Sequence, residues 1–142
     1  MPTRAQLSKS AEHEGGHTEL MRAALEGRTD DVRTLLESKA EPNAKDDEGR
    51  TALMFAVTNI KTGCVNLLLS HGADVNATAN DGSTALMLAA SVGDSEIVRT
   101  LLSKGASKSG KFTETGKTAL ALAKEKDYAE IVELLQAAGS EQ

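Results

Sequence analysis

The stretch GKFTETGKT at residues 110–118 resembles a phosphate-binding loop and is the first candidate for chemistry. Such a loop needs four residues between its two glycines, so that backbone N–H groups surround a phosphate. Here five residues separate Gly110 from Gly116, and no apolar strand precedes them. Thr118 also occupies the same position of an internal repeat as Thr84. We therefore interpret the stretch as a turn and a helix start, with a nucleotide-dependent enzyme as the alternative.

Other residue types that catalyse reactions or bind metals are few and scattered. His13 lies near the start, His17 and His71 fall at different repeat positions, and Cys64 falls on an apolar helical stripe. No metal-ligand spacing or catalytic constellation results, so we predict no metal, no cofactor and no enzymatic activity. Cys64 is predicted to be a core residue. The carboxylates of KDDEG, residues 45–49, lack the spacing of a calcium loop and predict a solvated turn.

Composition narrows the choice of partner. The 142 residues carry a formal net charge of −5, which argues against nucleic acid, and no apolar run approaches the about 20 residues that span a membrane. The polar start has no apolar signal region, so we expect a flexible arm over residues 1–15. A single cysteine favours a reducing compartment, and we expect a cytoplasmic monomer.

Similar residues recur at an interval of 33. Thr18, Thr51 and Thr84 align in this way, and a fourth copy with Thr118 follows after 34 residues. A fixed period of this length indicates stacked repeats. Polar residues replace apolar ones in the first and last copies, as expected of terminal repeats. We predict a single domain over residues 16–142, with repeats at about 16–46, 47–79, 80–112 and 113–139.

Each copy predicts two helices. In the third copy, Thr84 is the predicted N-cap of a short helix, and Gly93 allows a left-handed turn after it. A second helix is expected to start at Asp94 or Ser95 and to end at Gly105. One such unit cannot bury its apolar stripe alone, so neighbouring copies must cover it.

These copies resemble the ankyrin repeat, whose signature is T-P-L-H-x-A. The matching segments are HTELMRAA, RTALMFAV, STALMLAA and KTALALAK. Glu or Ala stands at the family's proline, and Met or Ala stands at its histidine. Ile60 stands where Gly27 and Gly93 stand, so we expect a distorted turn at 59–61. The resemblance implies an all-α ankyrin-repeat solenoid of stacked helix-turn-helix units with β-turn or loop tips.

The resemblance also implies that another protein binds along a concave groove, for which Arg50 is the strongest expected contact and Leu25 and Val92 form the apolar centre. Phe112 is expected either to cover the last core or to act as an exposed anchor. Reversing the charges of Arg50 and Asp81 should change binding and leave the melt nearly intact. The predicted groove residues are Leu25, Glu26, Asp47, Glu48, Arg50, Thr58, Asn59, Asn80, Asp81, Ser83, Ser91, Val92, Glu114, Thr115, Lys117, Glu125 and Lys126.

The leading hypothesis is therefore a protein–protein interaction module that scaffolds, inhibits or localises a partner without turnover. Two alternatives remain: the nucleotide-dependent enzyme, and a structural or engineered scaffold without a native partner. The divergence of the repeats argues against an idealised design.

Overall fold

The computed structural model describes residues 14–137, which form helices joined by turns and loops. The elements are η1 (Glu14–Gly16), α2 (Glu19–Glu26), α3 (Thr29–Glu37), α4 (Ala52–Thr58), α5 (Thr62–Ser70), α6 (Ala85–Val92), α7 (Ser95–Ser103), α8 (Ala119–Glu125) and α9 (Ala129–Ala137). Within this range, β-type pairing is limited to an isolated bridge between Lys111 and Thr118. The predicted all-α class is confirmed. The arm expected over residues 1–15 lies outside the described residues, except for Glu14 and Gly15 in η1.

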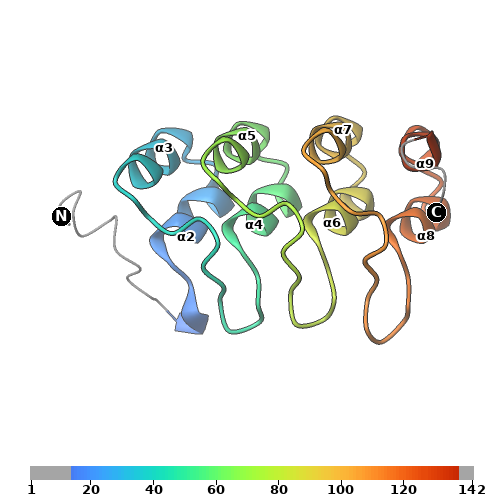
Figure 1. Ribbon diagram of the computed structural model, residues 1–142, viewed down its shortest axis with the longest axis horizontal. Helices are drawn as coiled ribbons and strands as arrows, with labels where there is room; N and C mark the ends of the chain where they lie inside the picture. The colour runs from blue at the N-terminus through green and yellow to red at the C-terminus, as the bar shows by residue number, and fades with distance from the viewer. Residues whose placement is uncertain (1–13, 138–142) are drawn as a thin grey trace. The chain divides into compact units, whose positions relative to one another are not determined.

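The helices fall into two compact units, one ending at Asp74 and the other beginning at Val75. Each unit contains two helix pairs. The first helices of the pairs are α2 and α4 in unit 1 and α6 and α8 in unit 2, and the second helices are α3, α5, α7 and α9. Within each unit, first helix packs beside first helix and second helix beside second helix, which gives two layers (Figure 1).

A threonine N-cap directly precedes each first helix. The threonine hydroxyl accepts a hydrogen bond from the N–H group three residues later, which satisfies one of the free donors at the helix start. The four caps are Thr18, Thr51, Thr84 and Thr118, with distances of 3.1, 3.4, 3.3 and 3.2 Å. In the first copy, the Met21 sulfur also accepts from the Thr18 N–H at 3.4 Å. The threonine register read from the sequence is thus a register of helix starts.

The turn between the two helices of a pair is left-handed in every copy. The residues with positive φ are Gly27, Ile60, Gly93 and Asp127, at 76°, 57°, 85° and 61°. At Ile60 the turn keeps the hydrogen bonds of the first copy, from Ile60 N to Val57 O and from Lys61 N to Ala56 O. The expected distortion at 59–61 is therefore wrong. The backbone is preserved, and Ile60 instead carries a conformation that costs an L-residue about 1–2 kcal/mol.

Unit 1 buries aliphatic side chains from both layers. Leu53 of α4 is 1% exposed, and Leu68 of α5 is fully buried. Asn43 joins the loops that follow the two second helices, because its Nδ2 donates to Gly72 O at 3.1 Å and its Oδ1 accepts from Asp74 N at 2.6 Å. Side-chain packing and one bridging amide thus fix the two copies to each other.

Unit 2 repeats this arrangement. Leu101 of α7 is fully buried, and Ile131 of α9 is 1% exposed. Asn76 donates to Gly105 O at 3.2 Å and accepts from Ser107 N at 2.7 Å, as Asn43 does in unit 1. The same asparagine bridge therefore recurs after 33 residues.

Candidate functional site

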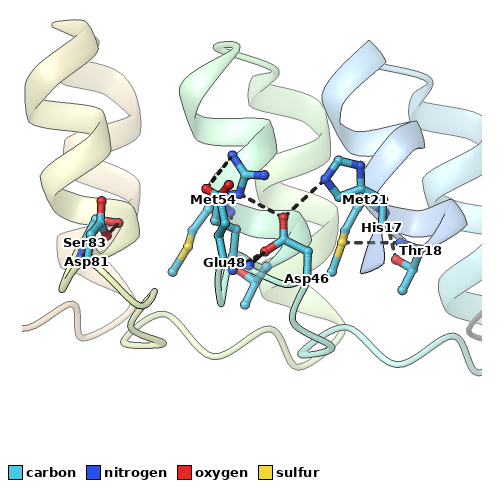
Figure 2. A network of polar contacts seen from close by, with 10 residues as sticks. His17, Thr18, Met21, Asp46, Glu48, Met54, Asp81 and Ser83 are labelled. Carbon is cyan, nitrogen blue, oxygen red and sulfur yellow. Dashed lines mark hydrogen bonds and ion pairs between the residues drawn. The ribbon is translucent and has the colours of Figure 1, made fainter. Parts of the chain in front are cut away.

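The loop that precedes a first helix turns sharply at a tip, and the tips are residues 46–50, 79–83 and 113–117. In the first of these tips, the Asp46 carboxylate is fully buried. It accepts hydrogen bonds from Glu48 N at 2.9 Å, from Arg50 N at 2.8 Å and from Arg50 Nε at 2.8 Å (Figure 2). Asp46 thus holds this tip closed from inside.

The ionisation of Asp46 follows from these contacts. Burial alone would raise the pKa of the carboxyl group. Hydrogen bonds from the Arg50 backbone and guanidinium and from the Glu48 backbone outweigh burial and lower the pKa of Asp46 below its usual value of 3.8. A carboxylate with a lowered pKa and three donors is a poor general base at neutral pH.

Two rings extend this cluster. His17 Nε2 lies 3.3 Å from Asp46 Oδ2, and the His17 ring meets Phe55 edge-on with centroids 5.4 Å apart. The Arg50 guanidinium lies over the Phe55 ring at 4.8 Å from its centroid. Cation–π and edge-to-face contacts of this kind orient the charged groups and do not neutralise their charges. The first and second copies therefore share one ordered cluster inside unit 1.

The cluster corrects one sequence-based expectation and changes the expected result of one experiment. KDDEG is not simply a solvated turn, because Asp46 is only 6% exposed. Reversing Arg50 would place a second carboxylate against a buried one, so the melt would not stay intact. His17, Asp46 and Phe55 were all missed as members of a cluster. The repeat alignment held a signal for the burial of Asp46, because the matching residue of the next copy is the apolar Ala79.

The next tip is built differently. Asp81 Oδ1 accepts from Ser83 N at 3.0 Å and from Ser83 Oγ at 2.7 Å. Ser83 is 4% exposed, so it offers little surface to a partner, whereas Asn80 and Asp81 are exposed. Ser83 shapes the turn rather than the surface.

The fourth copy contains the phosphate-loop resemblance, and its backbone is already occupied. Phe112 N donates to Lys117 O at 3.0 Å, and Gly116 N donates to Phe112 O at 2.8 Å. The Lys117 ammonium pairs with Glu125 at 2.6 Å. A phosphate cradle needs such N–H groups and its lysine directed at the ligand. Residues 110–118 thus contain the repeat's tip, with Glu114 and Thr115 exposed and Phe112 half-buried.

The predicted positions on the first helices differ between the units. In unit 1, Leu25, Glu26, Thr58 and Asn59 are all exposed. Glu26 accepts from Arg28 Nε at 2.8 Å, and Asn59 donates to the backbone of its own helix. No hydrogen bond or ion pair engages the side chains of Leu25 and Thr58 within the described residues.

In unit 2, four of the predicted residues bind one another. Lys126 Nζ donates to Ser91 O at 3.0 Å and to Ser91 Oγ at 3.3 Å, which joins α6 to the turn after α8. Glu125 is engaged by Lys117. Ser91 and Val92 are half-buried. The structure therefore brings four of the predicted contact residues of unit 2 into two pairs.

Cys64, the one cysteine of the sequence, is buried. Cys64 is 1% exposed, as predicted for a core residue, and burial raises the pKa of its thiol. Its nearest polar contact is Thr29 Oγ1 at 3.9 Å. Within residues 14–137, no group of three or more histidine, cysteine or acidic residues could hold a metal ion. No helix in this part of the chain is long and apolar enough to cross a membrane.

Repeated helix pairs with equivalent caps, turns and bridging asparagines define an all-α repeat protein. The family model described as ankyrin repeats, in three copies, matches residues 20–112 and 76–142. The chain belongs to the ankyrin repeat family, and its described part contains four helix pairs. No curated protein matches the chain. Proteins built from ankyrin repeats are generally protein–protein interaction modules.

Proposed function

We propose that the exposed residues of the first helices and tips bind a partner protein, so that the chain acts as a scaffold, adaptor or inhibitor without catalysis. The observation that supports this most is the exposure of Leu25 and Thr58 on first helices whose caps and turns repeat from copy to copy. A frame fixed in this way loses little conformational entropy on binding. The mechanism is surface complementarity on a rigid support.

The proposed contact residues are those predicted from the sequence, apart from Ser83. Leu25 and Thr58 are exposed and have no polar partner to give up among the described residues, whereas Lys117, Glu125, Ser91 and Lys126 must exchange their internal partners for new ones. Unit 1 therefore offers the surface that costs least to engage.

The proposal includes the setting of the chain. The recurrence of the capping threonines from Thr18 to Thr118, at intervals of 33 or 34 residues, supports a single domain over residues 16–142, with the four repeats predicted above. A buried thiol at Cys64 suits a reducing compartment, so we place the protein in the cytoplasm, as a monomer.

Affinity capture with matched variants tests the proposal. The wild type is compared with Leu25→Arg/Thr58→Arg on the first helices and with Asn66→Arg/Ser70→Arg on α5, a second helix. All four positions are exposed, and each variant adds two arginines. Proteins captured from a cell lysate are purified, and their affinity for all three chains is measured.

The first-helix variant should lose at least about tenfold in affinity, and the α5 variant should bind as the wild type does. Equal binding to all three chains, or loss only in the α5 variant, rejects this surface. Circular dichroism melts confirm that the variants are folded.

A further inference from the structure

The exposed large apolar side chains of the described residues are Leu25, 38% exposed, and Ile60, 47% exposed. Both belong to unit 1, where α2 and α4 pack side by side. The two helix ends adjoin, because a Cβ built on Gly27 would lie 2.9 Å from Lys61 Cδ. Leu25 and Ile60 thus stand at neighbouring ends of the first helices.

The backbone at Ile60 is unfavourable for its side chain. Its φ of 57° is left-handed, a conformation that suits glycine and strains a β-branched residue. The matching residues of the other copies are Gly27, Gly93 and Asp127. Strain at an exposed residue, with nearly half of its side chain in solvent, is a feature that functional surfaces retain.

Two cations flank these side chains. Arg22 precedes Leu25 by three residues and shares its helix face, and Lys61 follows Ile60. Neither cation has a carboxylate partner among the described residues. The nearby carboxylates of Glu19, Glu26 and Asp31 are instead gathered around Arg28, at 3.9, 2.8 and 2.7 Å. The groups available for a new ion pair on this patch are therefore cations.

We propose that the Leu25–Ile60 patch, made of Arg22, Leu25, Ile60 and Lys61, docks an acidic segment of a partner protein that also presents an apolar side chain. The apolar side chain packs between Leu25 and Ile60, and the segment's carboxylates pair with Arg22 and Lys61. This inference rests on the proposed function and specifies the partner's chemistry.

Selection from a phage-displayed library of random short peptides tests the inference. The purified chain should enrich peptides that combine Asp or Glu with Leu, Ile, Met or Phe. Their affinities, measured by fluorescence anisotropy, should fall about tenfold or more in Ile60→Gly and in Arg22→Glu/Lys61→Glu. Ile60→Val, which keeps an apolar β-branched side chain, should retain binding. Arg33→Glu on α3 removes a cation from a second helix and should leave binding unchanged.

Ile60→Gly removes the anchor without threatening the fold, because glycine occupies the matching turn in two other copies. A melt that stays cooperative shows that lost binding reflects the missing side chain. Enrichment of basic peptides, failure to enrich any peptide, or full affinity in Ile60→Gly overturns the inference. Binding of phosphatidylserine vesicles that is lost in the same variants overturns it in favour of a lipid.

The outcomes separate this inference from the proposed function. Peptides that bind Ile60→Gly and Arg22→Glu/Lys61→Glu normally but not Leu25→Arg/Thr58→Arg would support the first-helix surface and reject the patch. Peptides that bind every first-helix variant as tightly as the wild type would reject both the patch and the proposed first-helix surface.

Discussion

Replacing Asp46 with alanine tests whether the buried carboxylate organises the tip at 46–50. The substitution removes the acceptor of three hydrogen bonds, from Glu48 N, Arg50 N and Arg50 Nε. Alanine fits the site, since Ala79 is the matching residue of the next copy and is also buried. The substitution therefore measures the contribution of the carboxylate, because the side chain that replaces it fits the tip.

The expected loss of unfolding free energy is smaller than the sum of three separate hydrogen bonds. Hydrogen bonds to a charged group each contribute about 1.5–3 kcal/mol. Glu48 is exposed and Arg50 is partly so, which means that water can replace the lost acceptor for some donors. We therefore expect Asp46→Ala to destabilise the fold by about 2–4 kcal/mol at pH 7. Asp46→Asn, which retains one oxygen acceptor, should lose less.

The effect must also depend on pH in one direction. The pKa of Asp46 is lower in the folded chain than its ordinary value of 3.8. Its stabilisation is thus complete above the unfolded pKa and disappears as pH falls through the folded pKa. The stability difference between the wild type and Asp46→Ala should be constant near neutrality and should shrink below about pH 4.

Urea unfolding followed by far-UV circular dichroism, at neutral and acid pH, measures both effects. The control is Glu48→Ala, whose side chain is 73% exposed and which should change stability by less than about 0.5 kcal/mol. An equally small change for Asp46→Ala, or a difference that grows in acid, refutes the reasoning about the tip.

Three further predictions test other parts of the structure. Asn43→Ala removes both bonds between the loops of unit 1 and should cost about 1–3 kcal/mol in urea unfolding, while an unchanged midpoint would mean that the bridge contributes nothing. Leu68→Ala and Leu101→Ala should each destabilise by about 2–5 kcal/mol, and a loss below about 0.5 kcal/mol would place these residues outside the core. Calorimetric titration with ATP should give no saturable binding, whereas binding that Lys117→Ala abolishes would restore the nucleotide-dependent enzyme.

The register predicted most of the fold because each repeat position has a local physical role. A threonine directly before an apolar helical stripe is typical of an N-cap. Thr18, Thr51, Thr84 and Thr118 all cap helices in the structure. Asp94, one of the two expected starts of α7, is its N-cap. Leu68 and Leu101 are buried because both lie on the stripe that neighbouring copies cover.

Residues with roles that depend on neighbouring copies were harder to predict. Asp46 lies beside His17 of the first copy, whose ring contacts Phe55 of α4, and no local sequence pattern predicts these contacts. At Ile60, side-chain preference argued for distortion, but the two hydrogen bonds that this turn shares with the turns of the first and fourth copies outweighed it. The sequence likewise did not predict the hydrogen bond from Lys126 to Ser91, which lies 35 residues away in the chain.

The most direct test of the binding surface is amide hydrogen exchange of the chain with and without a captured partner. The account predicts that the partner slows exchange in the first helices of unit 1, above all at the ends of α2 and α4, and leaves α3 and α5 unchanged. Slower exchange confined to α3 and α5 would contradict it.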